Sequence, residues 1–333
     1  MAWKKSSAGL LLAASLVAAP LERFEAVEPH MGTLVRITLY APDSDSARKG
    51  FAAAFERIRA LDETLSDYKA TSELSRLRAG APIPVSEDLF RLLSAAQDLA
   101  RETRGAFDIT LGAAIRLWRE ARRAHRLPAE EERRLALQHC GYRYLKLDPR
   151  RRAVQILQPG LQLDPGGIAK GFAASEALTV LRARGLPRSL VAVSGDLAIG
   201  DAPPDRAGWR VQVDRPLLLH NCAVSTSGDT EQYVEIGGVR YSHIIDPKTG
   251  LGLTTRIRVT VLARDGATAD GLATALSVLT PSEGRKVALR HHARVWYSAS
   301  RSLRVAGAGG ASAFDTIRER QPDGGAITSI SHP

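Results

Sequence analysis

The sequence predicts an α+β fold. Short segments rich in Val, Ile and Leu are interleaved with longer segments whose apolar residues recur at helical spacing, and several short segments are paired as in hairpins. Strands this short and this often paired do not suit a doubly wound parallel sheet. The chain has 333 residues, 44% of them hydrophobic and 25% charged, so it can bury a large core in one domain or in two closely packed ones.

The helical segments are the clearest part of this pattern. Apolar side chains at Phe51, Phe55, Ile58 and Leu61 lie at helical spacing and mark one buried face. A later helix is expected to end at Gly105, because glycine readily adopts the conformation that closes helices. Helices are therefore expected over residues 45–65, 86–104, 119–139, 169–184 and 269–279.

Strands are expected between and before these helices. Residues 24–40 suit a strand or a hairpin with a bend at residues 30–33. No internal repeat is visible, so a repeat architecture is not indicated. Further strands are expected over residues 143–147, 153–157, 190–194, 209–213 and 256–263.

The two ends of the chain differ in composition from the rest. Lys4 and Lys5 precede an apolar run that ends at Ala19, which is typical of a short export signal, with a disordered leader as the alternative. The run is too short to span a bilayer. We expect an export signal or leader over residues 1–19, a folded domain over 24–305, a poorly ordered tail over 306–333, and an exported location that is periplasmic or membrane-associated and faces the periplasm.

The formal net charge of +10 raises the question of a nucleic-acid partner. The basic residues are spread over the predicted helices rather than gathered in one stripe, and aromatic residues make up only 5% of the chain. Without aromatic side chains to stack on bases or a recognisable binding motif, nucleic-acid binding is disfavoured. Anionic small molecules or a membrane surface are the more economical partners for this charge.

The chain has two cysteines, Cys140 and Cys222, far apart in the sequence. Neither has a partner at a spacing typical of metal ligands. One disulfide and two buried thiols are both compatible with the sequence.

The segment LDPGGIAKGFAAS, residues 163–175, has the layout of an anion-binding loop. Gly166 and Gly167 lack a Cβ, so their backbone N–H groups can approach a bulky ligand closely. A helix begins just after them, and a helix N-terminus offers unpaired amides and partial positive charge, to which Lys170 adds a full charge. The alternative is an ordinary turn, because Asp-Pro-Gly-Gly is also a common turn sequence.

The segment DGATADGLATAL, residues 265–276, places Asp270 and Thr274 four positions apart on a predicted helix. Residues at this spacing share a face of the helix. A carboxylate and a hydroxyl so placed can supply hard oxygen ligands to Mg²⁺, which often bridges to substrate phosphates. The alternative is that the aspartate caps the helix and the threonine bonds to its own helix.

Other motifs carry weaker signals. His243 lies in SHIIDPKTG, where a histidine at a strand end can act as a base or orient a hydroxyl, although a lone histidine is more often structural. The motifs VSGD at 193–196 and STSGD at 225–229 suit polar turns, with or without a ligand. A Ser/His/Asp hydrolase is disfavoured because no nucleophile elbow is present, and phosphate-loop, dinucleotide and zinc patterns are also lacking.

These and other short motifs follow one another in a fixed order: MGTLVRI at 31–37, SDY at 66–68, GAFDIT at 105–110, LDPGGIAKGFA at 163–173, VSGD at 193–196, STSGD at 225–229, HIIDPKTG at 243–250 and ADGLATAL at 269–276. In this order they resemble the ApbE family of flavin transferases, from about residue 25 to 300. The resemblance implies an α+β fold related to the T-fold, with two lobes and FAD held in the cleft between them. It also implies an Mg²⁺-dependent FAD:protein FMN transferase, which attaches FMN from FAD to a serine or threonine of a target protein and releases AMP.

The resemblance further implies roles for individual residues. The metal ligands would be Asp270, Thr274 and the backbone carbonyl of Gly167. His243 falls where the family places a histidine close to the reacting phosphate. The residues that fall where the family contacts FAD are Met31, Tyr68, Ala106, Phe107, Asp108, Asp164, Lys170 and Ile245.

Two positions depart from the family pattern. The family commonly has Asp where Ser175 stands and Pro where Gly252 stands, but neither position is an implied metal ligand. The implied partner is an exported or membrane-associated redox protein with an Asp/Ser-Gly-Ala-Thr-like acceptor motif. Two alternatives remain open: an FAD pyrophosphatase that yields FMN and AMP, and a non-catalytic periplasmic flavin-binding protein.

Overall fold

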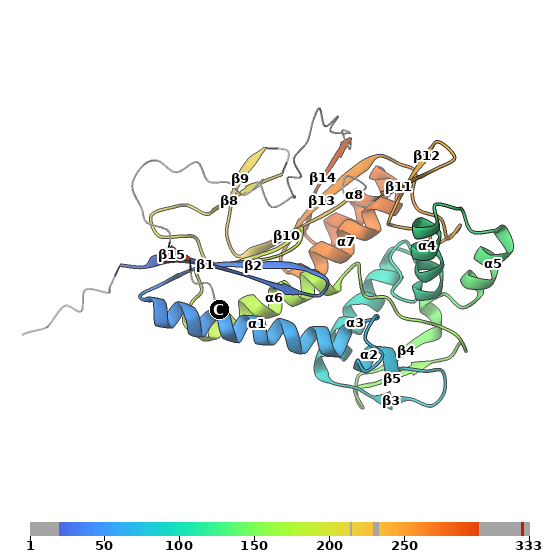
Figure 1. The fold of residues 1–333 in the computed structure, drawn as a ribbon, viewed down its shortest axis with the longest axis horizontal. Helices are drawn as coiled ribbons and strands as arrows, with labels where there is room; N and C mark the ends of the chain where they lie inside the picture. The colour runs from blue at the N-terminus through green and yellow to red at the C-terminus, as the bar shows by residue number, and fades with distance from the viewer. Residues whose placement is uncertain (1–19, 214, 229–232, 300–327, 330–333) are drawn as a thin grey trace, which may run out of the picture.

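The structure is a computed structural model that describes residues 20–213, 215–228, 233–299 and 328–329 (Figure 1). Its central element is an eight-stranded sheet with the order β14-β13-β10-β7-β6-β2-β1-β15. Every pairing in this sheet is antiparallel except that of β1 with β15. The strands are β1 (Glu22–His30), β2 (Thr33–Ala41), β6 (Ser189–Val193), β7 (Asp196–Ile199), β10 (Cys222–Ser227), β13 (Ile257–Ala263), β14 (Arg294–Ala299) and β15 (Thr328–Ser329).

One face of this sheet is covered by the helices α1 (Ser44–Leu65), α6 (Ala169–Ala183) and α7 (Gly266–Val278). Figure 1 shows α1 and α6 beneath β1 and β2, with α7 beside β10. Alternate residues of β2, such as Ile37 and Leu39, are fully buried against the apolar stripe of α1 that includes Phe55 and Ile58. The alternating apolar residues of the strand and the helically spaced apolar residues of α1 therefore pack together in one core.

The opposite face of the sheet is covered by a two-stranded ribbon, β8 (Trp209–Gln212) and β9 (Pro216–Leu219). Trp209 and Val211 of the ribbon pack with Leu190, Ile199 and other residues that point away from the helices. Strands buried on both faces explain the near-continuous apolar runs in β6 and β13.

A second group of elements lies at the other end of the molecule (Figure 1). Its helix α3 contacts α7, and the two groups share a buried cluster that includes Leu92, Phe107, Ile168 and Leu272. Trp118 of α4 belongs to a smaller cluster with residues of the β11–β12 hairpin. The elements of this group are α2 (Glu73–Arg76), β3 (Ile83–Pro84), α3 (Glu87–Glu102), α4 (Gly112–Ala124), α5 (Glu130–Gln138), η1 (Tyr142–Tyr144), β4 (Leu145–Asp148), β5 (Ala153–Ile156), β11 (Tyr233–Ile236) and β12 (Val239–Ser242). Outside this group, the last helix of the described residues is α8 (Pro281–Arg290).

The predicted α+β class is confirmed, and most predicted elements lie within a few residues of the observed ones. The prediction of one helix over 119–139 was wrong. His125 adopts φ of 48° and ends α4, and α5 begins only after Pro128, which cannot donate a hydrogen bond to a continuing helix. The helix predicted over 269–279 begins earlier than predicted, because Asp265 caps α7 and the helix starts at Gly266.

Two other expectations concern the cysteines and the chain ends. Cys140 and Cys222 are free thiols, and burial raises the pKa of each to about 11. Within the described ranges, no helix is both long and apolar enough to cross a membrane. The predicted leader over residues 1–19 and most of the predicted tail over 306–333 lie outside the described residues.

Candidate functional site

The loop of residues 163–168, the first part of the predicted anion-binding segment 163–175, is folded by its own aspartate. Asp164 accepts a hydrogen bond from the N–H of Gly166 at 2.8 Å through Oδ1, and its own N–H donates to the carbonyl of Ile109 at 2.8 Å. The chain then enters α6, with the N–H of Ile168 bonded to the carbonyl of Pro165 at 3.0 Å. This turn sets the carbonyls of Gly166 and Gly167 at the start of the helix.

Asp270 and Thr274 both point from α7 toward this loop. The hydroxyl of Thr274 lies 3.4 Å from the carbonyl oxygen of Gly167, and Oδ2 of Asp270 accepts a hydrogen bond from the N–H of Gly171 at 3.0 Å. The capping alternative is excluded, because Asp265 caps α7 by accepting from the N–H of Thr268 at 2.9 Å. The side chains of Asp270 and Thr274 therefore join two helices rather than bond within one.

The donor set at this point fits a small hard cation. It combines the carboxylate of Asp270, which is 2% exposed, with the hydroxyl of Thr274 and the carbonyl of Gly167. The N–H of Gly171 and the ammonium of Lys170 both lie next to Oδ2 of this carboxylate. Mg²⁺ is typically held by one or two carboxylates together with other oxygens and substrate phosphates. The described residues contain no group of three or more His, Cys, Asp or Glu side chains placed to hold a metal ion.

Lys170 lies beside these oxygens, in the first turn of α6. Its ammonium is 3.0 Å from Oδ2 of Asp196, 3.3 Å from the carbonyl oxygen of Gly166 and 3.7 Å from Oδ2 of Asp270. Burial alone would lower the pKa of Lys170, but the two carboxylates outweigh burial and raise it above its usual value. Burial also raises the pKa of Asp270 to about 7, with the charge of Asp196 adding to the shift and Lys170 opposing it. Lys170 is therefore a fixed positive charge at the start of α6.

Phe107 connects this cluster to the hydrophobic core. Its ring is buried, and a Cβ placed on Gly167 would lie 3.3 Å from it and 2.9 Å from the hydroxyl of Thr274. Glycine at this position thus lets the loop approach both side chains. Ala106, which precedes Phe107, is half-buried in the same loop.

Asp108 turns away from the cluster. Its Oδ1 accepts from the N–H and the hydroxyl of Thr110 at 2.8 and 2.6 Å, and its Oδ2 accepts from the N–H of Tyr142 at 2.8 Å. Burial raises the pKa of Asp108 despite these three hydrogen bonds. The observed contacts of Asp108 stabilise the loop, and its predicted role toward FAD stays a prediction.

Tyr68 and Asp164 are joined by a residue that the sequence analysis missed, Arg119 of α4. Its guanidinium lies 4.7 Å from the centre of the Tyr68 ring, 2.7 Å from Oδ2 of Asp164 and 2.8 Å from Oδ2 of Asp67. Tyr68 itself is 72% exposed, and its predicted contact with FAD stays a prediction. Burial raises the pKa of Asp164 to about 6, with the Asp67 charge adding to the shift and Arg119 opposing it.

The remaining predicted residues come from other parts of the fold. Met31 forms the turn between β1 and β2 with φ of 51°, and it packs against both large buried clusters. His243 is half-buried directly after β12, whose last residue, Ser242, accepts a hydrogen bond from the indole of Trp118 at 3.0 Å. Ile245 is buried in the Trp118 cluster. The roles proposed for these three residues stay predictions.

Both departures from the expected motif pattern have a structural reason in this chain. The hydroxyl of Ser175 accepts a hydrogen bond from the N–H of Gly266 at 2.7 Å and so supports the first turn of α7. A Cβ on Gly252 would lie 2.2 Å from the carbonyl oxygen of Ser242 and 2.6 Å from the ring of Trp118. There is no room for a side chain at position 252 while Trp118 occupies its place.

Two further residues were assigned only to turns in the sequence, namely Asp196 and Ser225. Asp196 is 4% exposed, accepts a hydrogen bond from the hydroxyl of Ser225, and pairs with Lys170. An aspartate at the start of a strand was the available signal, but nothing in the sequence indicates that β7 and β10 pair.

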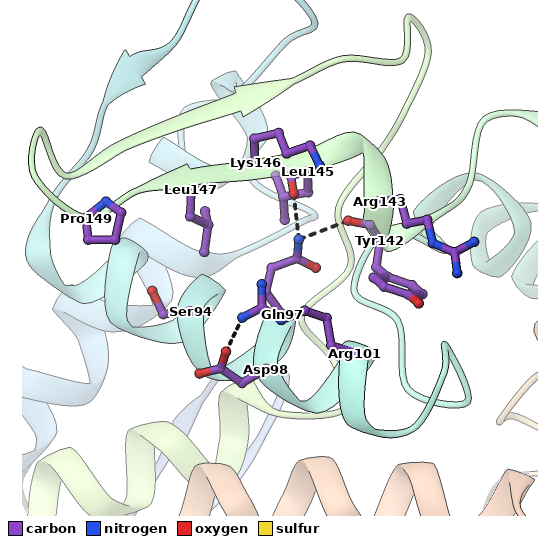
Figure 2. A pocket seen from close by; sticks show the side chains of 10 residues that line it. All are labelled: Ser94, Gln97, Asp98, Arg101, Tyr142, Arg143, Leu145, Lys146, Leu147 and Pro149. Atoms are coloured by element: carbon purple, nitrogen blue, oxygen red, sulfur yellow. Dashed lines mark hydrogen bonds and ion pairs between the residues drawn. The ribbon is translucent and has the colours of Figure 1, made fainter.

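A cavity of about 390 Å³ lies elsewhere, between α3 and β4 (Figure 2). In Figure 2, the amide nitrogen of Gln97 donates to the carbonyls of Tyr142 and Leu145, at 2.9 and 2.6 Å. These bonds tie η1 and β4 to α3. None of the predicted site residues lines this cavity, so the α6–α7 cluster is the candidate active site.

Comparisons with known proteins identify the family of the chain. A model described as the ApbE family matches residues 31–296. The chain is 31% identical over 303 residues to the FAD:protein FMN transferase of Vibrio cholerae, covering 86% of this chain and 90% of that protein. It is 32% identical over 289 residues to the protein of the same name from Treponema pallidum, covering 78% and 80%.

Solved structures give the same result for the fold. The apo form of the Pseudomonas stutzeri flavinyl transferase ApbE superposes with a TM-score of 0.75 at 29% identity, covering 85% of this chain and 93% of that one. The ApbE protein of Thermotoga maritima superposes with a TM-score of 0.76 at 29% identity, covering 90% and 100%.

Proposed function

The chain belongs to the ApbE family, and we propose that its α6–α7 cluster is where it acts as an Mg²⁺-dependent FAD:protein FMN transferase. Its substrates are FAD and an acceptor protein. The single observation that carries the site assignment is the convergence of Gly167, Lys170, Asp270 and Thr274 at the start of α6.

The proposed metal ligands are the carboxylate of Asp270, the hydroxyl of Thr274 and the carbonyl of Gly167. When bound there, Mg²⁺ would neutralise charge on the pyrophosphate of FAD. The support is the chemistry of these ligands, which are hard oxygens, and the burial of the Asp270 carboxylate beside them.

Lys170 and the N-terminus of α6 supply the protein's own positive charge. The ammonium of Lys170 is held between Asp196 and Asp270, and the partial positive charge of a helix N-terminus adds to it. Together they favour a pyrophosphate at the loop of residues 163–168. The exposed ring of Tyr68, with the guanidinium of Arg119 over it, suits stacking with the aromatic part of FAD.

In the proposed reaction, a hydroxyl oxygen of the acceptor attacks the phosphorus on the FMN side of the pyrophosphate. The new P–O bond joins FMN to the acceptor, the bond to the AMP oxygen breaks, and AMP leaves with the electron pair. His243 is the proposed residue that accepts or orients the proton of the attacking hydroxyl. The support for His243 is the motif HIIDPKTG and its placement directly after β12.

The acceptor and the location belong to the same proposal. We propose an acceptor with an Asp/Ser-Gly-Ala-Thr-like motif on an exported or membrane-associated redox protein. A periplasmic location is supported by the basic and apolar composition of residues 1–19.

The test is a transfer assay with purified protein, FAD, MgCl₂ and a peptide that contains Asp-Gly-Ala-Thr-Ser. We expect an FMN adduct on the threonine of the peptide by mass spectrometry, with release of AMP. Asp270→Asn should abolish both, whereas Asp201→Asn, outside the cluster, should leave both unchanged. Free FMN and AMP without an adduct would contradict the transferase and indicate a pyrophosphatase, and intact FAD would contradict both.

His243 is tested in the same assay. His243→Asn should slow the adduct at least tenfold while the affinity for FAD stays within about twofold, because a general base contributes to the rate more than to binding. An unchanged rate would exclude the proposed role.

A further inference from the structure

Asp196 and Ser225 lie side by side because β7 and β10 are neighbours in the sheet. The pairing of Val224 with Leu197 places Ser225 opposite Asp196. The hydroxyl of Ser225 donates to Oδ1 of Asp196, and both side chains are nearly fully buried, at 1% and 4% exposure. The hydrogen bond therefore fixes the carboxylate on the sheet.

The strand pattern directs this pair toward the helices. Leu197 and Val224 pack with residues of the opposite face, whereas Ala198 and Ala223 belong to the clusters on the helix side. Because side chains alternate along a strand, Asp196 and Ser225 share the helix side with Ala198 and Ala223. Asp196 is thus a carboxylate of the sheet that reaches the start of α6.

Lys170 lies closer to this sheet carboxylate than to the one on α7. Its ammonium is 3.0 Å from Oδ2 of Asp196 and 3.7 Å from Oδ2 of Asp270. Only the first distance is that of a hydrogen bond. The N–H of Gly171 holds the same oxygen of Asp270 from the other side, at 3.0 Å.

A cation that pairs fully with Asp270 would compete with a metal ion for that carboxylate. Of the three side chains, two are carboxylates and one is the ammonium of Lys170. If Asp196 lacked its charge, the ammonium would be attracted to Asp270 alone and would move toward it. The carboxylate of Asp196 offsets the positive charge of Lys170, which leaves the Asp270 carboxylate available to a divalent cation.

We propose that Asp196, fixed by Ser225, is a positioning residue that holds Lys170 toward the sheet and so keeps the Asp270 carboxylate available to a divalent cation. This inference rests on the metal site of the proposed function. It assigns the VSGD and STSGD motifs to one shared function. VSGD supplies the carboxylate of Asp196, and STSGD supplies the hydroxyl of Ser225 that donates to it.

The experiment measures metal binding without turnover. Mn²⁺ is titrated into the purified protein in the absence of FAD and acceptor, and free Mn²⁺ is followed by electron paramagnetic resonance. Asp196→Asn should weaken Mn²⁺ binding by about tenfold, and Ser225→Ala, which keeps the carboxylate, by about two- to fivefold, the range expected for one lost hydrogen bond. Asp201→Asn, on the segment after β7, should bind Mn²⁺ like the unaltered protein.

A double-mutant cycle distinguishes positioning from a general effect of charge or folding. If Asp196 acts through Lys170, adding Asp196→Asn to Lys170→Met should change Mn²⁺ affinity by less than about threefold. Equal weakening in both backgrounds would overturn the inference, and so would Asp196→Asn that binds Mn²⁺ normally.

The metal site itself can fail separately. If the unaltered protein binds no Mn²⁺, or if Asp270→Asn binds it equally well, the metal assignment and this inference are both overturned. If the unaltered protein binds Mn²⁺ through Asp270 and only the Asp196 variants behave contrary to expectation, the inference alone is overturned. Thermal melting of each variant confirms that a loss of binding is measured on folded protein.

Discussion

Gly171 of α6 and Gly266 of α7 face each other so closely that a Cβ on either would lie 2.0 Å from the carbonyl oxygen of the other. Residues without a side chain are therefore required where the two helices cross. This close approach lets Asp270 accept a hydrogen bond from the backbone of α6 at 3.0 Å and brings Thr274 to the loop of Gly167. The glycine pair thus sets the spacing of the candidate site.

The first prediction concerns this crossing. Gly171→Ala should lower the free energy of unfolding by about 1–3 kcal/mol or more, because backbone atoms must separate to admit the methyl group. Gly195→Ala is the control, since its Cβ would have 3.6 Å to the nearest atom, and it should stay within about 0.5 kcal/mol of the unaltered protein. Urea unfolding measures both, and equal stability of the two variants would contradict the packing argument.

The second prediction concerns the hydroxyl of Thr274. Thr274→Val keeps the shape of the side chain but removes a proposed oxygen ligand, so the Mg²⁺ concentration that gives half-maximal transfer should rise about tenfold or more. Thr274→Ser keeps the oxygen and should shift this Mg²⁺ concentration by less than about threefold. Initial rates of adduct formation at a series of MgCl₂ concentrations measure this. Equal Mg²⁺ requirements for the Val and Ser variants would argue against Thr274 as a ligand.

The third prediction is a pH dependence of stability at Asp164. Its pKa of about 6 in the folded protein lies above the usual value near 3.9, so between these pH values the folded state holds a proton that the unfolded state has lost. Its stabilising contribution is therefore present below about pH 4 and is lost as the pH rises through 6.

Asp164→Asn removes this titration. Relative to the unaltered protein, the variant should gain stability between pH 4 and pH 7, by at most about 3 kcal/mol, which corresponds to a shift of roughly two units. Urea unfolding of both proteins at the two pH values measures the difference. A difference in stability that is the same at both pH values would contradict the raised pKa.

The fourth prediction compares two arginines of α1. Arg57 reaches Asp88 of α3 and Glu176 of α6, at 2.6 and 2.5 Å, and it is half-buried. Arg59 pairs with Glu56 and Glu63 on the exposed side of its own helix.

Replacing each arginine with glutamine should have unequal effects. Arg57→Gln should lower the unfolding free energy by about 1–3 kcal/mol, because it leaves Asp88 and Glu176 partly buried without their shared cation. Arg59→Gln should change it much less, as is usual for exposed pairs. Urea unfolding at low and at moderate salt measures both. A larger effect at Arg59 would contradict this ranking.

The fold was predictable from the sequence where the signal is local. The apolar spacing of Phe51, Phe55 and Ile58 identified α1 almost to its ends, and the Asp164-Pro-Gly-Gly turn identified the start of α6. The helix over 119–139 was mispredicted because charged residues continue across the break, and the left-handed backbone at His125 has no strong sequence signal. The sheet order could not be predicted, because strands far apart in sequence pair through backbone groups that every residue carries.

By itself, the sequence determined the α+β class, the family motifs and their order, the glycine loop, and the placement of Asp270 and Thr274 on one face of a helix. These depend on spacing along the chain, which is set by backbone geometry. Only the tertiary structure decided that the face of Asp270 meets Gly167 and Lys170, that Asp196 joins Ser225 beneath them, and that Arg119 links Tyr68 to Asp164. Such contacts depend on strand register and on how closely two helices pack, and both are fixed only when the whole core forms.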